Sequence, residues 1–423
     1  MLKVIWWQKL FWEVEISWSK NASLPIIAAS LLLRKVTLHN VPRIWDVLTF
    51  LNIIESLWVK VDFTWNTLKM DSSWMSLEKF NKELINKIRV WIFLLPSILQ
   101  KFWEIDIPFP GWCNIWKRPI DEHIKWLVKL GYKNEDWMEK VHLSGSMEAW
   151  EKELIIDWFS VTATENLIIA SVLRPWKTVL RLWAIEPHVI NLIDFFNKAW
   201  AKIKLDYDHT INIEWVEKLA DEIDFSICSD YIEAWTFMVL WALTSKEYID
   251  IKNACILDLK SFLAKLEEAW VRFEKIWDDT LRVFNSIDNL KAVRFQTKVF
   301  PWLPTDLQSP LCVLLTQADW ISKIEEVIYE WRLNFLVEIE KMKWHPAILN
   351  PHEALIFWKT KLKWATVSSW DLRAWVAMII AWLVASGDTH ITNVEYIERW
   401  YEDIIWKIRK LWAVIERVSS EDV

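Results

Sequence analysis

The stretch VINLIDFFNKAWAKIKLDYD, residues 189–208, joins an expected α-helix directly to an expected β-strand. Its first half repeats apolar residues at the spacing of one helical face, and after position 200 apolar and polar residues alternate as in a half-buried strand. A helix that turns straight into a strand commonly needs a left-handed residue at its C-terminal end. Glycine is favoured there because a Cβ atom is costly in that conformation. Trp200 occupies this position.

The same pattern occurs six times, which indicates an internal repeat of about 70 residues. We call the residue between the helix and the strand of each copy its stop. The six stops are Trp58, Gly131, Trp200, Trp270, Trp344 and Trp412. This period is too long for a solenoid, so we expect six α/β units, three in each of two domains. Each unit is predicted to contain a strand, a turn, a helix and further strands, as in residues 36–39 before 44–57 and residues 391–394 before 401–411.

Tryptophan at five of the six stops matches an abnormal composition. The chain has 36 tryptophans and 4 glycines among 423 residues, whereas glycine alone usually makes up about 7% of a protein. An aromatic binding surface would place the rings on one strand face beside basic residues, and a core role would require a partner for each indole N–H. We favour a third interpretation, in which the gene belongs to a genetic code where UGA specifies glycine. The printed sequence would then result from translating the gene with a table where UGA specifies tryptophan, so most of the tryptophans would stand for glycine.

Charge and patterning exclude several classes of protein. The net charge is -7, which does not fit a general binder of nucleic acid or anionic membranes, so an anionic ligand must meet a local cationic site. No apolar run approaches the roughly 18 residues of a membrane span, and charged residues near the start argue against a signal peptide. No CxxC pair is present, so we expect neither a disulfide framework nor a zinc site. The cysteines are Cys113, Cys228, Cys255 and Cys312. The expected location is the cytoplasm.

Arginines recur at the strand-to-helix turns, where helix N-termini attract anions and guanidinium groups match phosphate and carboxylate. They are Arg43, Arg118, Arg332 and Arg399. The turn PGWCNIWKRPIDEH, residues 110–123, places Cys113 on a loop whose basic residues favour its thiolate. The loop lacks the Ser or Thr of a phosphate-binding P-loop, and the chain has no dinucleotide fingerprint, HExxH or nucleophile elbow.

The cysteine loop resembles that of the UDP-N-acetylglucosamine 1-carboxyvinyltransferases, a family of enolpyruvyl transferases. Similar segments are LFWEVEISWSKNA (10–22), VTLHNVP (36–42), IEAWTF (232–237), FPWLPTDLQ (300–308), DLRAW (371–375) and ERWYE (398–402). At most of them tryptophan stands where the family has glycine. The resemblance implies an inside-out α/β barrel of two domains, each of three repeated α/β units, with the active site in the cleft between them. The domains would be residues 20–228, and residues 1–19 with 229–423.

The implied reaction transfers the enolpyruvyl group of phosphoenolpyruvate to the 3-hydroxyl of UDP-N-acetylglucosamine and releases phosphate. This is the first committed step of peptidoglycan synthesis, and so serves cell-wall biogenesis, cell shape and division. No metal, organic cofactor, nucleic acid, membrane or obligate protein partner is implied. Two alternatives stay open: enolpyruvyl transfer to shikimate 3-phosphate, and a non-catalytic homologue that binds a UDP-sugar. The Cys113 loop and residues 118–121 favour the nucleotide sugar.

The resemblance also implies residue roles. Cys113 would be the acid, its thiolate also able to form an adduct with phosphoenolpyruvate, and Asp306 the base near the sugar hydroxyl. Lys20, Arg118 and Arg399 would hold phosphoenolpyruvate. The nucleotide sugar would be positioned by Asn21, Arg89, Arg118, Pro119, Ile120, Asp121, His123, Ser160, Val161 and Ile328, while Arg332, Asp371 and Arg373 would support the site and its closure. By residue type alone, Asp306 would be a helix cap and His123 a core or cap residue.

Overall fold

The computed structural model describes residues 2–4, 13–81, 88–108, 121–137, 140–145, 152–156, 159–367, 372–387, 389–391, 401–410 and 415–417. The chain divides into two compact units. Trp18–Cys228 form one, called here the 18–228 unit. Met1–Ser17 and Ser229–Val423 form the other, called the 229–423 unit.

The 18–228 unit contains three successive repeats, each with a buried helix, a strand, an outer helix and a β-hairpin. The first holds α1 (Lys20–Ser30), β3 (Lys35–His39), α2 (Trp45–Glu55), β4 (Lys60–Thr64) and β5 (Thr67–Asp71). The second holds η1 (Arg89–Phe93), α4 (Leu94–Phe102), β6 (Glu104–Pro108), α5 (Asp121–Lys129), β7 (Lys133–Trp137), β8 (Lys140–Ser144) and β9 (Lys152–Ile155). The third holds α6 (Val161–Ser171), β10 (Thr178–Arg181), α7 (Pro187–Lys198), β11 (Lys202–Asp206), β12 (Thr210–Glu214) and β13 (Glu222–Ser226).

Two of the three sheets described in this unit join one repeat to another. The three strand orders are β13-β3-β5-β4, β6-β8-β7 and β11-β12-β10-β9. Strand β9 of the second repeat runs parallel to β10 of the third, and β13 at the end of the third runs parallel to β3 of the first. The last strand of the unit therefore pairs with a strand of the first repeat.

The 229–423 unit repeats this plan and includes two strands from the start of the chain. Its elements before residue 300 are β1 (Leu2–Val4), β2 (Glu13–Glu15), α8 (Tyr231–Thr244), β14 (Tyr248–Lys252), η2 (Ile256–Leu259), α9 (Lys260–Glu268), β15 (Phe273–Trp277), β16 (Thr280–Phe284) and β17 (Arg294–Gln296). The later ones are η3 (Thr305–Leu307), α10 (Gln308–Leu315), β18 (Ser322–Glu325), η4 (Arg332–Asn334), α11 (Phe335–Glu340), β19 (Ala347–Asn350), β20 (Glu353–Ile356), β21 (Thr366–Val367), α12 (Leu372–Val384), β22 (Thr389–Ile391), α14 (Ile404–Lys410) and β23 (Ile415–Arg417).

The sheets of the 229–423 unit have the orders β15-β16-β14-β2, β17-β18-β20-β19 and β21-β22-β1-β23. Strand β2 runs parallel to β14, while β1 lies between β22 and β23 and is antiparallel to both. Two strands from the first 15 residues therefore complete two sheets built mainly by residues after 229.

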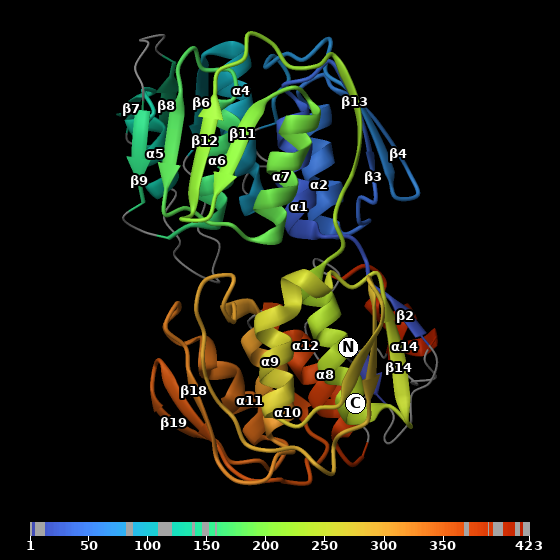
Figure 1. Cartoon of the computed structure of the whole chain (residues 1–423). Helices are drawn as coiled ribbons and strands as arrows, with labels where there is room; N and C mark the ends of the chain where they lie inside the picture. The colour runs from blue at the N-terminus through green and yellow to red at the C-terminus, as the bar shows by residue number, and fades with distance from the viewer. Residues whose placement is uncertain are drawn as a thin grey trace. The chain divides into compact units, whose positions relative to one another are not determined.

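The fold of each unit is inside out because its helices form the centre and its sheets the outside. Every residue of α8 and of α10 is buried, as are ten of the eleven residues of α1. A helix that is apolar on all sides can only be stable when neighbours surround it. Helices α8, α10 and α12 contact one another, as do α1, α4 and α6. Within each unit, sheets flank these helices in Figure 1. The predicted inside-out α/β architecture is confirmed.

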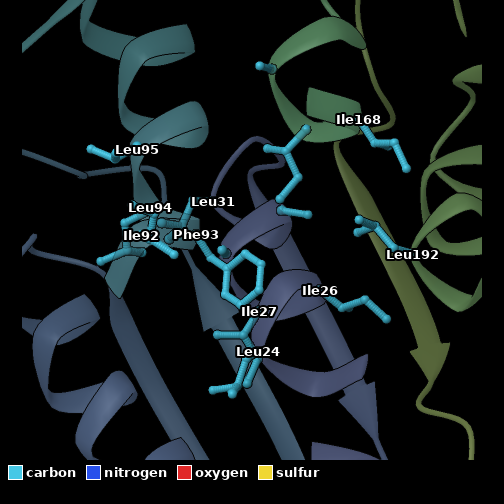
Figure 2. Close-up of a cluster of buried hydrophobic side chains, with 14 of the residues drawn as sticks. Leu24, Ile26, Ile27, Leu31, Ile92, Phe93, Leu94, Leu95, Ile168 and Leu192 are labelled. Atoms are coloured by element: carbon cyan, nitrogen blue, oxygen red, sulfur yellow. The ribbon is translucent and has the colours of Figure 1, made fainter. Parts of the chain in front are cut away.

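Figure 2 shows how the helices of the 18–228 unit share one core. Leu24, Ile26 and Ile27 of α1 lie beside residues 92–95 of η1 and α4, with Ile168 of α6 and Leu192 of α7 in the same cluster. The buried helix at the start of each repeat was absent from the predicted strand–turn–helix order. Such helices lack the one-sided periodicity on which that prediction depended.

The predicted left-handed stops are present in four of the six repeats. Trp58, Gly131, Trp200 and Trp270 have φ angles of 63°, 112°, 72° and 62°. The prediction for Trp344 is wrong, because Lys343 takes the left-handed conformation with φ 66°. The chain turns one residue earlier there, and the Trp344 ring is buried. Trp412 lies outside the described residues.

Tryptophan is buried more often than the sequence led us to expect. Nine described tryptophans are buried, and the indole N–H groups of Trp183 and Trp235 donate to the carbonyls of Leu154 and Leu307. Six buried indole nitrogens in the described residues have no hydrogen-bond partner. They are those of Trp126, Trp176, Trp241, Trp344, Trp375 and Trp382. Because buried indole N–H groups usually find partners, these sites are poorly suited to tryptophan.

Candidate functional site

The sequence-predicted site residues are distributed over both units. Six of them, Cys113, Arg118, Pro119, Ile120, Asp371 and Arg399, lie outside the described residues. For three more the structure gives the element but not the side chain: Arg89 begins η1, Asp121 begins α5, and Arg373 lies in the first turn of α12. The remaining eight are described in full.

Lys20 and Asn21 are the first residues of α1, where the Ser19 hydroxyl caps the helix by accepting from the N–H of Ala22. The Lys20 ammonium is buried and forms an ion pair with Asp46 in the first turn of α2. The carboxylate lies at a helix N-terminus, where the helix dipole favours negative charge. A buried ammonium needs such a counter-ion, and Asp46 supplies one to Lys20.

Ser160, Val161 and His123 come together at the N-terminus of α6. The Ser160 hydroxyl caps this helix by accepting from the N–H of Ala163 at 3.3 Å, and Val161 is its first residue. Thr162 lies 3.4 Å from the Ser160 oxygen and 3.2 Å from Nε2 of His123. Two residues that the sequence placed in one binding site, Ser160 and His123, therefore share one hydrogen-bonded cluster, and Val161 follows Ser160 in the chain.

The hydrogen bonds assign one tautomer to His123. The Asn166 amide nitrogen, which can only donate, lies 3.0 Å from Nδ1 of His123 and also donates to the carbonyl of Ile92 at 3.2 Å. Nδ1 therefore accepts, so Nε2 carries the proton and donates to Thr162. Because Ile92 is in η1, which Arg89 begins, Asn166 connects α6 to the element that carries another predicted site residue.

In the 229–423 unit, Asp306 and Arg332 form an ion pair. Nη2 of Arg332 lies 2.5 Å from Oδ1 of Asp306, and Nη1 donates to the Thr305 hydroxyl at 2.8 Å. The Arg332 side chain is 9% exposed, whereas the Asp306 side chain is 31% exposed. Arg332 thus holds the carboxylate of Asp306, whose side chain stays partly exposed.

Glu326 connects this ion pair to Ile328. It is fully buried and follows the end of β18. Its Oε1 accepts from the backbone N–H groups of Ile328 and Tyr329, at 2.9 and 3.1 Å. Its Oε2 accepts from the Thr305 hydroxyl at 2.6 Å, which brings residues 305, 306, 328 and 332 into one network.

Several residues of these clusters were missed by the sequence prediction. They are Asp46, Thr162, Asn166, Thr305 and Glu326. A signal for two of them was present, since Asn166 interrupts the apolar run of α6 and Glu326 directly follows Glu325, the last residue of β18. Arg43 is one of the arginines that we expected to bind an anion at a strand-to-helix turn. Its guanidinium donates to the backbone carbonyls of Phe63 and Trp65.

Two absences apply to the described part of the chain. No group of three or more His, Cys, Asp or Glu side chains there is arranged to hold a metal ion. None of the helices described is both long enough and apolar enough to span a bilayer.

Three curated relatives align with nearly the whole chain. A UDP-N-acetylglucosamine 1-carboxyvinyltransferase of Finegoldia magna is 36% identical over 97% of this chain and 97% of its own. The protein named UDP-N-acetylglucosamine 1-carboxyvinyltransferase 3 of Caldanaerobacter subterraneus subsp. tengcongensis is 37% identical over 96% of both chains. UDP-N-acetylglucosamine 1-carboxyvinyltransferase 2 of Prochlorococcus marinus is 34% identical over 99% of this chain and 98% of its own.

Solved structures share the fold at lower sequence identity. The enolpyruvyl transferase NikO from Streptomyces tendae superposes with a TM-score of 0.90 at 19% identity, over 99% of each chain. An EPSP synthase from Acinetobacter baumannii gives a TM-score of 0.76 at 14% identity, over 98% of this chain and 99% of its own. The EPSP synthase (3-phosphoshikimate 1-carboxyvinyltransferase) family model matches residues 7–408. With a match of this extent and relatives of this identity, the chain belongs to the EPSP synthase family of carboxyvinyltransferases.

Proposed function

We propose that the chain transfers the enolpyruvyl group of phosphoenolpyruvate to the 3-hydroxyl of UDP-N-acetylglucosamine and releases phosphate. The observation that carries this proposal is the near full-length similarity to curated proteins of that name, at 34–37% identity. The reaction would supply peptidoglycan synthesis in the cytoplasm. The names of the relatives favour UDP-N-acetylglucosamine over shikimate 3-phosphate as the acceptor.

The chemistry needs an acid and a base. The sugar hydroxyl oxygen attacks C2 of phosphoenolpyruvate as its proton passes to the base and the acid protonates C3, which yields a tetrahedral intermediate. Loss of a proton from C3 and of phosphate from C2 then restores the double bond in the product. We assign the base to Asp306 and the acid to Cys113, whose thiolate can also add to C2 of phosphoenolpyruvate.

The geometry around Asp306 supports this assignment. A general base must be deprotonated and must reach the proton it removes. The ion pair with Arg332 favours the charged carboxylate, and the partial exposure of Asp306 leaves it accessible to a substrate hydroxyl. A carboxylate in this arrangement is suited to accept the proton of the sugar 3-hydroxyl.

Cationic groups are proposed to hold phosphoenolpyruvate, which carries a phosphate and a carboxylate. We assign this role to Lys20, Arg118 and Arg399. Lys20 is preorganised because the Asp46 carboxylate fixes its ammonium in a buried position. Preorganised charges in a site shielded from water stabilise developing negative charge more strongly than solvated ones do.

The nucleotide sugar is proposed to bind at the N-terminus of α6. The backbone N–H groups of a helix's first turn attract phosphate, and here Ser160 and Val161 begin the helix. His123 orders this turn through Thr162. The other residues assigned to the nucleotide sugar are Asn21, Arg89, Arg118, Pro119, Ile120, Asp121 and Ile328, and Arg332, Asp371 and Arg373 are assigned to supporting the site.

The proposal is tested by measuring phosphate release from phosphoenolpyruvate in the presence of each acceptor. The assay uses the chain as printed and a second version with glycine at the tryptophan positions. We expect release with UDP-N-acetylglucosamine and none with shikimate 3-phosphate. Asp306→Asn should lower kcat by about 10²- to 10⁴-fold, the usual contribution of a general base, and Cys113→Ser should abolish most turnover.

Binding measurements separate the alternatives. If both versions fold and bind UDP-N-acetylglucosamine but release no phosphate, the chain is a binding homologue and the proposed catalysis is wrong. Release with shikimate 3-phosphate alone would assign it to the other reaction. Full activity of Asp306→Asn would overturn the choice of base.

A further inference from the structure

Glu326 is a buried carboxylate whose two oxygens together accept four hydrogen bonds. The side chain is fully buried, and each oxygen accepts two hydrogen bonds. Oε1 takes the backbone N–H groups of Ile328 and Tyr329, while Oε2 takes the Thr305 hydroxyl and, at 2.7 Å, the Gln308 amide. Because a buried charge is costly unless it is fully hydrogen-bonded, this arrangement indicates a specific task.

In the hydrogen bonds that connect Glu326 to Thr305 and Arg332, the donor and the acceptor can be assigned in only one way. The Arg332 guanidinium can only donate, so the Thr305 oxygen accepts from Nη1. Since a hydroxyl has one proton and the ionised carboxylate can only accept, Thr305 donates that proton to Oε2 of Glu326. The other guanidinium nitrogen, Nη2, is thereby aimed at Oδ1 of Asp306. Arg332 therefore donates to Asp306 on one side and to Thr305 on the other, and Thr305 in turn donates to Glu326, so a series of hydrogen bonds connects Glu326 to Asp306.

We propose that Glu326 is a positioning residue for the reaction and sets the orientation of the Asp306 carboxylate through Thr305 and Arg332. This inference rests on the proposed function of Asp306 as the base. Glu326 acts at a distance, since its own oxygens are occupied by Thr305, Gln308 and two backbone N–H groups. The same carboxylate also orders the turn that carries Ile328, so one buried charge organises two of the residues assigned to the sugar substrate.

A carboxylate is the side chain that this position requires. All four groups around it are donors when Thr305 accepts from Arg332. A glutamine at this position has one oxygen and one amide nitrogen, and the nitrogen would face two donors whichever way it turned. Glu326→Gln therefore preserves the shape of the side chain but forces Thr305 or the 328–329 turn to change its hydrogen bonds.

Thr305 offers a sharper test, because its substitutions can break the series without removing the buried charge. Thr305→Val removes the hydroxyl at similar volume, and Thr305→Ser keeps it. Gln308→Met is the matched control, since it also removes one bond to Oε2 but leaves the contacts of Arg332 intact. Each variant is prepared in the version of the full chain that turns over, and kcat, both KM values and UDP-N-acetylglucosamine affinity are measured.

We expect Thr305→Val and Glu326→Gln to lower kcat by about 10²-fold, the scale of a small misplacement of a reacting group. The KM for phosphoenolpyruvate should change little, Thr305→Ser should restore most of kcat, and Gln308→Met should retain most of it. If Gln308→Met loses as much kcat as Thr305→Val, or if Thr305→Ser fails to restore it, Glu326 has a structural role only and the proposal is wrong.

The proposed function fails in a different way. If neither the printed chain nor the version with glycine releases phosphate, or if Asp306→Asn turns over normally, the base assignment is overturned and the positioning role is overturned with it. If Asp306→Asn loses turnover while Thr305→Val keeps it, the base assignment stands and only the positioning role is wrong.

Discussion

Tryptophans in the left-handed region of backbone space are the clearest anomaly of single residues in this protein. Seven of the thirteen described residues other than glycine with positive φ are tryptophan. They are Trp58, Trp65, Trp103, Trp200, Trp270, Trp320 and Trp331. Each left-handed residue with a Cβ atom costs about 1–2 kcal/mol, and glycine avoids that cost. The unpartnered indoles of the core point independently to the same substitution, because glycine has no side-chain N–H to satisfy.

The genetic-code hypothesis predicts glycine at these sites in the protein made by its own cell. The peptide that spans Leu57 to Val61 should have the mass of a sequence with glycine at position 58. Tandem mass spectrometry of the native protein measures this directly. Tryptophan in that peptide would show that the cell itself reads this codon as tryptophan. The hypothesis would then be wrong, and the chain would tolerate tryptophan in the left-handed conformation.

Restoring glycine at one stop should stabilise the chain. For Trp200→Gly, relief of about 1–2 kcal/mol of backbone strain outweighs about 0.5–1 kcal/mol from the greater freedom of glycine in the unfolded chain, a net gain of about 1 kcal/mol. Denaturant unfolding measures the change. The control is Trp74→Gly, which replaces an exposed tryptophan without positive φ and should give no gain. Equal effects of both substitutions would contradict the strain argument.

At the scale of elements, the central helices are apolar on all sides but carry a few polar residues with defined partners. In α6, Asn166 holds His123, while the neighbouring Glu165 is fully buried. Burial raises the pKa of Glu165 well above its ordinary value, and the nearby Glu186 carboxylate raises it further. The helix that positions a candidate binding cluster therefore contains a carboxyl that the fold favours in its protonated form.

This burial predicts a pH dependence of stability. Because the pKa of Glu165 is raised in the folded state, the folded chain holds a proton that the unfolded chain has lost above about pH 4.3. Its contribution to the free energy of unfolding is fully present below that pH and falls as the pH rises through the folded pKa. Glu165→Gln should remove this decline. Melting temperatures across the pH range measure it, with Glu267→Gln on the exposed face of α9 as the control. Parallel curves for the unmodified chain and Glu165→Gln would refute the prediction.

At the scale of the whole molecule, the first 17 residues belong to the 229–423 unit, although the 18–228 unit follows them in the chain. Strand β2 pairs with β14, and Val14 is buried in the core of the 229–423 unit although residue 18 begins the other unit. The chain therefore passes between units twice, near residues 17 and 228. On the 229–423 side, the Glu233 carboxylate accepts from the N–H of Ser17 and from the Lys407 ammonium, while Asp230 N–H donates to the Ser17 carbonyl.

This topology predicts which unit an N-terminal substitution destabilises. Val14→Asp would bury an unpaired charge and should cost about 3 kcal/mol or more. Hydrogen exchange should become faster in β14 and β16, which are more than 230 residues away in sequence, and stay unchanged in β3. Glu15→Gln, at an exposed position of the same strand, is the control and should leave exchange unchanged. Faster exchange in β3 alone would contradict the pairing.

The sequence alone determined the repeat, the outer helices and strands, and the family. These depend on local patterns: a one-sided helical stripe such as residues 189–196, the alternation after Trp200, and motifs such as PTDLQ around Asp306. The sequence could not predict the central helices, since α8 and α10 are buried on every side and have no polar face to reveal their period.

Only the tertiary structure decided which residues support the candidate site. Asp46 meets Lys20 across 26 residues, Asn166 meets His123 across 43, and Arg332 meets Asp306 across 26. Nothing in the local pattern marks such pairs, because each is created by the packing of elements far apart in the chain. Burial then decides their energetics. A carboxylate such as Glu326 becomes an organising group only when water is excluded and its four donors are brought together from two segments, residues 305–308 and residues 328–329.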